Sequence, residues 1–128
     1  MVKVVLCGMG AIGTEILDYL LKRSHEVLAV VDSDPEKVGR SVAELTGLPL
    51  GIRVAGTIQG VQLDGADVVI FSTTSRITGM ADDISFAASS GVDVVTTSEE
   101  MAYPAYSGAG VAERLNRIAT DKGVTILG

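Results

Sequence analysis

The stretch LCGMGAIGTEI, residues 6–16, spaces three glycines as G-x-G-x-x-G. An apolar run, VKVVLC, comes before the first of these glycines at residues 2–7. Apolar residues at helical spacing share one predicted face after the loop: Ile12, Ile16, Leu17, Leu20 and Leu21. Glycines at this spacing can also form a plain tight turn, so the motif alone is a weak signal. A strand before the loop and a helix after it are typical of the first unit of an alternating β-α fold.

Short apolar strands and amphipathic helices alternate along the whole chain. We predict strands near residues 2–7, 26–31, 52–55, 67–71, 92–96 and 124–127. We predict long helices over residues 11–23, 77–90 and 104–123, and short helices beginning near residues 34–35 and 41–44. Strands that are apolar throughout are typical of a parallel sheet covered on both faces. The sequence therefore predicts one α/β domain over residues 1–128, a doubly wound (Rossmann) parallel sheet of six strands in the order 3-2-1-4-5-6.

In such a fold, each glycine of the loop has a separate role. Gly8 permits a tight turn out of the strand, and Gly10 leaves space for the pyrophosphate of a dinucleotide. Gly13 allows the helix to pack closely on the sheet. Backbone amides at the start of the helix, at Ala11 and Ile12, are expected to bind phosphate with the help of the helix dipole.

Asp32 follows the second predicted strand directly, 19 residues (32 − 13) beyond Gly13. The dinucleotide fingerprint has an acid about 20 residues on, where it accepts hydrogen bonds from the adenosine ribose. Its carboxylate would repel the 2′-phosphate of NADP, and Ser33 offers no compensating charge, so NAD is the expected cofactor. NADP stays possible because Arg40 could swing back toward the site. The alternative is that Asp32 only caps a helix and the glycines only form turns.

Hydroxyl side chains follow the fourth and fifth predicted strands. Thr73 and Thr74 come after the fourth strand and Ser98 after the fifth. Ligands of open α/β sheets bind outside the carboxyl ends of the strands, so these residues are expected to contact the nicotinamide half of the cofactor or the pyrophosphate. They could instead only cap the helices that follow them. No catalytic residue and no metal ligand is predicted, because the single histidine, His25, lies at the opposite end of the sheet.

The composition of the chain argues against nucleic acid and a membrane as partners. The chain carries a net charge of −6 and no tryptophan, which argues against a basic or stacking surface for nucleic acid. No apolar run approaches the roughly 18 residues of a membrane span. Cys7 is the single cysteine, so a disulfide framework is not expected within one chain. We expect a cytoplasmic protein in which Cys7 packs as a small apolar group.

Several motifs together resemble a known family. VVLCGMGAIGTEI, ADVVIFSTTS and above all GVDVVTTSEEMAYP are similar to the N-terminal domain of dihydrodipicolinate reductase-like proteins, and within them to enzymes that deaminate amino acids oxidatively. The resemblance covers nearly the whole chain and implies hydride transfer with NAD or NADP. Members of that family continue into a second domain, which supplies substrate-binding and proton-transfer groups and often the dimer interface. This chain ends at Gly128, so we expect an isolated cofactor-binding domain that is inactive alone, with a C-terminal substrate domain and a possible homodimer as its partners.

Two other functions are compatible with the fold. One is a free-standing NAD-binding or redox-sensing module without catalysis. The other is a methyltransferase that binds S-adenosylmethionine through a glycine loop, although the full G-x-G-x-x-G motif and the all-parallel strand pattern argue against it. Fold alone does not establish function, so the substrate class rests on the resemblance.

Overall fold

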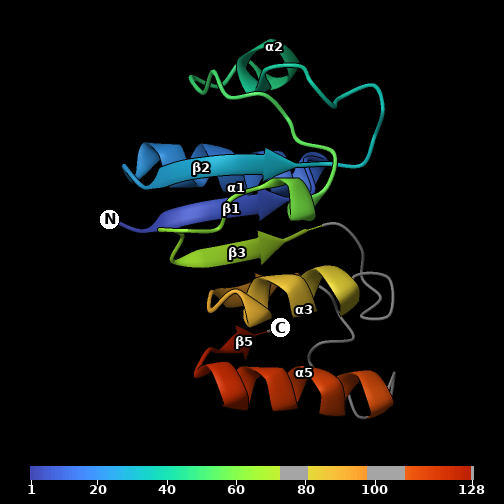
Figure 1. The fold of residues 1–128 in the computed structure, drawn as a ribbon. Coiled ribbons are helices and arrows are strands. Elements are labelled where there is room, and N and C mark those ends of the chain that lie inside the picture. The colour runs from blue at the N-terminus through green and yellow to red at the C-terminus, as the bar shows by residue number, and fades with distance from the viewer. Residues whose placement is uncertain (73–80, 98–108, 128) are drawn as a thin grey trace.

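A five-stranded parallel sheet forms the centre of the molecule in a computed structural model, which describes residues 1–72, 81–97 and 109–127 (Figure 1). The strands are β1 (Lys3–Cys7), β2 (Glu26–Val31), β3 (Val68–Phe71), β4 (Asp93–Thr96) and β5 (Ile126–Leu127). Their order is β2-β1-β3-β4-β5, and every pair is parallel. The described helices are α1 (Ala11–Lys22), α2 (Val42–Thr46), α3 (Ala81–Ser89) and α5 (Ala109–Lys122), with a short 3₁₀ turn, η1 (Ile58–Gly60). The predicted α/β parallel sheet is confirmed.

Each face of the sheet buries its own core. Val4 and Leu6 of β1 pack in a cluster with Leu17 of α1. Val5 and Cys7, which alternate with them, pack in a second cluster that includes side chains of α3 and α5. Figure 1 shows the same layers, with α1 behind the sheet and α3 and α5 in front of it. Apolar side chains on both faces explain why the strands are uniformly apolar in the sequence.

The sheet has five described strands and not six, because the third predicted strand, at residues 52–55, does not form. Only Ala55 pairs with the end of β2, through a parallel bridge to Val31, while Arg53 forms an antiparallel bridge with Ser41. The Val54 N–H donates to the Arg40 carbonyl at 2.9 Å, and apart from Ala55, whose N–H donates to the Val30 carbonyl, this segment forms its backbone hydrogen bonds with residues 39–43. The described strands therefore follow the predicted order once the predicted strand at residues 52–55 is removed from it.

Two local predictions need correction. Ile12 does not share the buried face of α1: it is 58% exposed, because it lies in the first turn of the helix, beside the loop at the edge of the sheet. Residues 35–39 form turns rather than a short helix. The helix predicted at residues 41–44 is confirmed as α2, where the Ser41 side chain accepts a hydrogen bond from the Glu44 N–H and Gly47 ends the helix with φ +78°.

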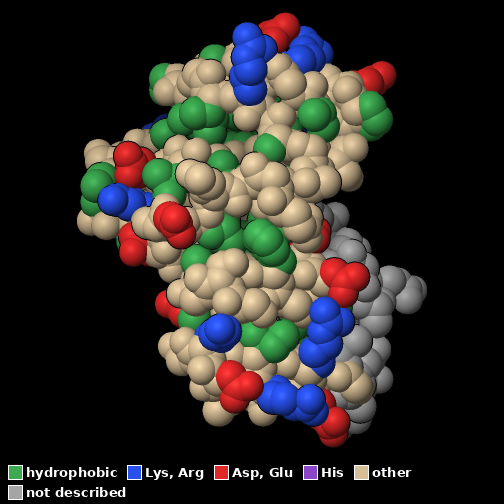
Figure 2. All heavy atoms as spheres, in the orientation of Figure 1, with side chains coloured by type: hydrophobic (Ala, Val, Ile, Leu, Met, Phe, Trp, Pro, Cys, Tyr) green, Lys and Arg blue, Asp and Glu red, His purple; other side chains and the backbone are tan. Residues whose placement is uncertain are grey.

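The surface over the front helices carries charges of both signs. The exposed residues of α5 include Glu113, Arg114, Arg117, Asp121 and Lys122, and Figure 2 shows acidic and basic side chains interspersed there. Arg114 also pairs with Asp82 of α3 at 3.1 Å. Within the described ranges, no helix has the length and apolarity that crossing a membrane would need.

Candidate functional site

The glycine loop lies at the carboxyl edge of the sheet, between β1 and α1. In Figure 1 the arrows of β1, β2 and β3 point the same way, so their carboxyl ends share this edge. Strand β1 has β2 on one side and β3 on the other, so the chain changes direction across the sheet at β1. Open α/β sheets bind ligands at such a topological switch point.

Gly8 makes the turn that leads out of β1. Its φ of +101° lies in the region that favours glycine. The Gly8 N–H donates to the Val31 carbonyl at 2.7 Å, and the Gly8 carbonyl accepts from the Ser72 hydroxyl at 2.8 Å. The turn is therefore held from β2 on one side and from the end of β3 on the other.

Gly13 is the point of closest approach between α1 and the loop. A Cβ atom added there would lie 2.0 Å from the Gly8 carbonyl oxygen and 2.9 Å from the Ser72 hydroxyl oxygen. Neither distance is compatible with a real side chain, so the packing of the helix on the sheet requires glycine at this position. This is the packing role that the sequence predicts for the third glycine.

Gly10 differs from the other two glycines of the loop. It is exposed and precedes α1 as its N-cap, with φ −85° and ψ −158°, a conformation open to other residues. A Cβ atom there would have no heavy atom of the described residues within 4 Å. Contacts within the described chain therefore do not require glycine, and the space above it can admit a ligand group.

The start of α1 is suited to an anion. The first turn, at Ala11, Ile12 and Gly13, carries no acidic residue, and the N-cap Gly10 has no side chain to accept a hydrogen bond. The first amides of a helix lack partners within the helix, and its dipole makes this end positive. A phosphate group can supply the missing acceptors.

Asp32 is tied to the glycine loop by its carboxylate. One oxygen accepts a hydrogen bond from the Met9 N–H at 2.8 Å, and the other accepts from the Asp34 N–H at 2.9 Å. The side chain is 15% exposed, so it lies at the edge of the site rather than on the open surface. Asp32 does not cap a helix, because the next helix, α2, begins only at Val42.

Lys37 joins this site, and the sequence did not predict it. Its ammonium donates to the Met9 carbonyl at 2.9 Å and lies 3.9 Å from a carboxylate oxygen of Asp32. Arg40, the cation considered from the sequence, instead pairs with Glu44 at 3.1 Å. A turn brings Lys37 back, since the Lys37 N–H donates to the carbonyl of Asp34. The Asp-Pro pair at residues 34–35 was the available signal, because such pairs favour turns.

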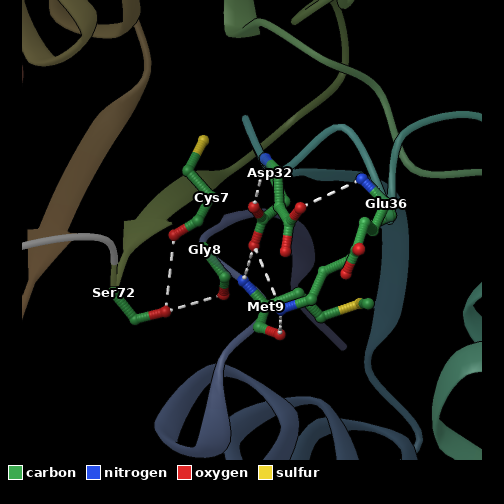
Figure 3. A network of polar contacts seen from close by, with 8 residues as sticks. Cys7, Gly8, Met9, Asp32, Glu36 and Ser72 are labelled. Carbon is green, nitrogen blue, oxygen red and sulfur yellow. Dashed lines mark hydrogen bonds and ion pairs between the residues drawn. The ribbon is translucent and has the colours of Figure 1, made fainter.

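Ser72 is a second residue that the sequence did not predict. It follows β3, whose last residue, Phe71, pairs with Cys7, so parallel register places Ser72 beside Gly8. In Figure 3, Gly8 and Met9 lie between Ser72 and Asp32, and both side chains hydrogen-bond to the loop backbone. These two side chains support the loop from opposite sides.

The remaining predicted site residues fall into two groups. Ala11, Ile12 and Ser33 are exposed around the loop, consistent with contact to a ligand. Thr73, Thr74 and Ser98 lie outside the described residues.

Cys7 is packed rather than reactive. Burial, with a contribution from the Asp83 carboxylate, raises the pKa of its thiol to about 12. The thiol therefore stays protonated at neutral pH and belongs to the apolar core, as expected. Across the described part of the chain, no group of three or more His, Cys, Asp or Glu residues is placed to hold a metal ion.

The sequence is 32% identical over 131 aligned residues to 2,4-diaminopentanoate dehydrogenase from Acetoanaerobium sticklandii. The chain resembles this dehydrogenase. The aligned region covers 99% of the chain and 37% of 2,4-diaminopentanoate dehydrogenase, so the chain spans little more than a third of this relative's length. The predicted resemblance to amino acid dehydrogenases is confirmed. No protein-family model matches the sequence.

Solved structures agree with this similarity. An amine dehydrogenase from Mycobacterium smegmatis superposes with a TM-score of 0.91 at 27% identity, over 99% of this chain and 38% of that one. More distant structures share the fold alone. They include a WlbA dehydrogenase from Bordetella pertussis in complex with NADH and UDP-GlcNAcA (TM-score 0.70, 17% identity, 99% and 36% coverage). A mutant of a hyperthermophilic archaeal homoserine dehydrogenase in complex with NADPH also superposes (TM-score 0.67, 16% identity, 98% and 43% coverage).

Proposed function

We propose that the chain is the nicotinamide dinucleotide-binding domain of a dehydrogenase that acts on an amino acid or amine. No atom of the described residues lies within 4 Å of a Cβ placed at Gly10, next to the uncapped start of α1, and this observation carries the proposal. The loop of residues 8–13 would hold the pyrophosphate, and Asp32 would accept hydrogen bonds from the adenosine ribose. The names of the two most similar proteins described above supply the class of substrate.

The chain's own residues would bind and orient the cofactor. When bound, a nicotinamide dinucleotide supplies hydride transfer, while the protein supplies position and electrostatics. Asp32 favours NAD over NADP, because its carboxylate repels a 2′-phosphate and the neighbouring Ser33 is uncharged. Thr73, Thr74 and Ser98 stay predictions for contacts near the nicotinamide.

The substrate would be held by a part of the protein outside this chain. Hydride transfer needs the reacting carbon held about 3–3.5 Å from its partner and an acid or base within hydrogen-bond reach. We therefore propose that residues 1–128 bind the cofactor but require a further domain for turnover, and that a homodimer would form through that larger protein.

A substitution at Gly10 tests the proposal by calorimetric titration with NAD. Gly10→Val places a side chain where the pyrophosphate would lie, and its backbone conformation tolerates valine. We expect loss of measurable NAD binding while the chain stays folded, at a cost of about 1 kcal/mol from the poorer N-cap. Gly51→Val is the matched control, since a Cβ there also meets no described atom within 4 Å. A folded Gly10→Val chain that binds NAD as tightly as the control would contradict the assignment.

A further inference from the structure

An acidic side chain, Asp32, and a basic side chain, Lys37, lie together where the adenosine ribose would bind. The Lys37 ammonium is 3.9 Å from the Asp32 carboxylate, and the two side chains are 29% and 15% exposed. A hydrogen bond of 2.9 Å to the Met9 carbonyl holds the ammonium against the glycine loop itself. A hydrogen bond and an ion pair therefore hold the cation at this edge of the site.

The carboxylate keeps capacity for a ligand. Each oxygen of Asp32 accepts one backbone N–H, from Met9 and from Asp34, and a carboxylate has about four acceptor positions in all. Ribose hydroxyls can donate to the positions that remain. A phosphate has no proton to donate there and would be repelled by the same carboxylate.

The Lys37 ammonium offsets the repulsion between the Asp32 carboxylate and a phosphate. An ammonium has three N–H donors, and the contact with Met9 uses one of them. A phosphate ester at the 2′ position, bound against Asp32, would meet this cation as well as the acid. Arg40 is engaged elsewhere, with the Glu44 carboxylate at 3.1 Å and the Glu36 carbonyl at 3.5 Å.

We propose that Lys37 determines cofactor specificity by donating a hydrogen bond to the 2′-phosphate of NADP, so that the site binds NADP as well as NAD. The inference rests on the proposed function and deepens it. Asp32 favours the free 2′-hydroxyl of NAD, Lys37 favours the phosphate of NADP, and their contact keeps the difference between the two affinities moderate.

The test is calorimetric titration of Lys37→Met with NAD and with NADP. A hydrogen bond to a charged group is worth roughly 10–100-fold in affinity, so NADP binding should weaken at least about tenfold. NAD binding should weaken much less than NADP binding, because loss of the Met9 contact affects both nucleotides alike and only NADP also loses a phosphate contact. The same titrations with ADP and 2′,5′-ADP isolate the adenosine end, and the larger loss should appear with 2′,5′-ADP.

Three variants serve as comparisons. Lys37→Arg keeps a cation and should retain most NADP binding. Lys22→Met removes a lysine that pairs with Asp18 on α1, and Arg40→Met removes the other cation considered for this role. Both should leave the ratio of NAD to NADP affinity unchanged. If Lys37→Met does not fold, Lys37→Gln makes the same comparison.

The outcomes separate this inference from the proposed function. An unchanged NAD to NADP ratio in Lys37→Met, or a changed ratio in Arg40→Met, overturns the role of Lys37. Unmodified protein that binds NAD but shows no NADP binding overturns only this inference. Protein that binds neither nucleotide overturns the proposed function and this inference together.

Discussion

Replacing Gly13 by alanine should destabilise the fold, because the added methyl group overlaps the glycine loop. Its Cβ would lie 2.0 Å from the Gly8 carbonyl oxygen, whereas carbon and oxygen atoms approach to about 3.3 Å. The start of α1 would have to move by about 1.3 Å, the difference between these distances. The Ser72 hydroxyl, 2.9 Å from the same Cβ, would also be displaced from its hydrogen bond to Gly8.

The size of the effect follows from two opposing contributions. Overpacking costs about 1–3 kcal/mol, and a clash against backbone on a helix that packs on the sheet belongs at the upper end of that range. Alanine returns up to about 1 kcal/mol because it favours a helix more than glycine does. We therefore expect the free energy of unfolding to fall by about 2 kcal/mol.

Urea denaturation followed by far-ultraviolet circular dichroism measures this loss. The midpoint should fall with an unchanged slope, since the surface exposed on unfolding stays the same. Gly10→Ser is the matched variant: its side chain has no described atom within 4 Å of the Cβ, and serine is a favoured N-cap. Its free energy of unfolding should stay within about 0.5 kcal/mol of the original. Equal stability of the Gly13→Ala and Gly10→Ser chains would refute the close packing of α1 against Gly8.

Four further predictions concern the site, the core and the surface. Asp32→Asn should weaken NAD binding by about 1.5–3 kcal/mol and shift the preference toward NADP, and an unchanged ratio in titrations would contradict the role of the carboxylate. Cys7 should resist alkylation at pH 8 in the folded chain and react after unfolding in guanidinium, because burial raises its pKa to about 12; mass spectrometry showing rapid labelling of the native chain would count against this burial. Ser41→Ala should lower the free energy of unfolding by about 1 kcal/mol in urea, through loss of the hydrogen bond from the Glu44 N–H, and no change would show that this cap does not stabilise α2. The isolated chain should form no NADH from a panel of amino acids, 2,4-diaminopentanoate included, and turnover in a spectrophotometric assay would show that it contains a catalytic group.

Local patterns predicted the elements that local contacts determine. The run before Gly8 became β1, the apolar spacing after Gly10 became most of α1, and the Ser41 cap began α2 where expected. The segment at residues 52–55 has a pattern that also suits a strand, but its hydrogen bonds go mainly to residues 39–43. The apolar pattern does not specify which segment accepts these hydrogen bonds, so a strand at residues 52–55 could not be ruled out from the sequence.

Contacts between distant segments explain the rest of what was missed. Ser72 reaches Gly8 only because β3 pairs in register with β1, 64 residues earlier in the chain. Lys37 reaches Met9 across 28 residues, after a turn whose direction the composition does not fix. Ile12 keeps the spacing of a buried residue but lies too near the edge of the sheet to be covered. The spacing of the glycines identified the loop, whereas the side chains that hydrogen-bond to it, Ser72 and Lys37, could be found only in the tertiary structure.

The three glycines of the loop can be separated by what each one excludes. Gly8 is explained by its backbone conformation and Gly13 by the atoms around it, so the fold alone accounts for both. Gly10 has an ordinary conformation and no described atom within 4 Å of a Cβ, and glycine is a poorer N-cap than serine or aspartate. A residue that weakens a local preference without gain to the fold is expected at functional sites. Contacts within the described residues therefore do not explain a glycine at this position, whereas an anionic group placed on the amides of α1 would explain it.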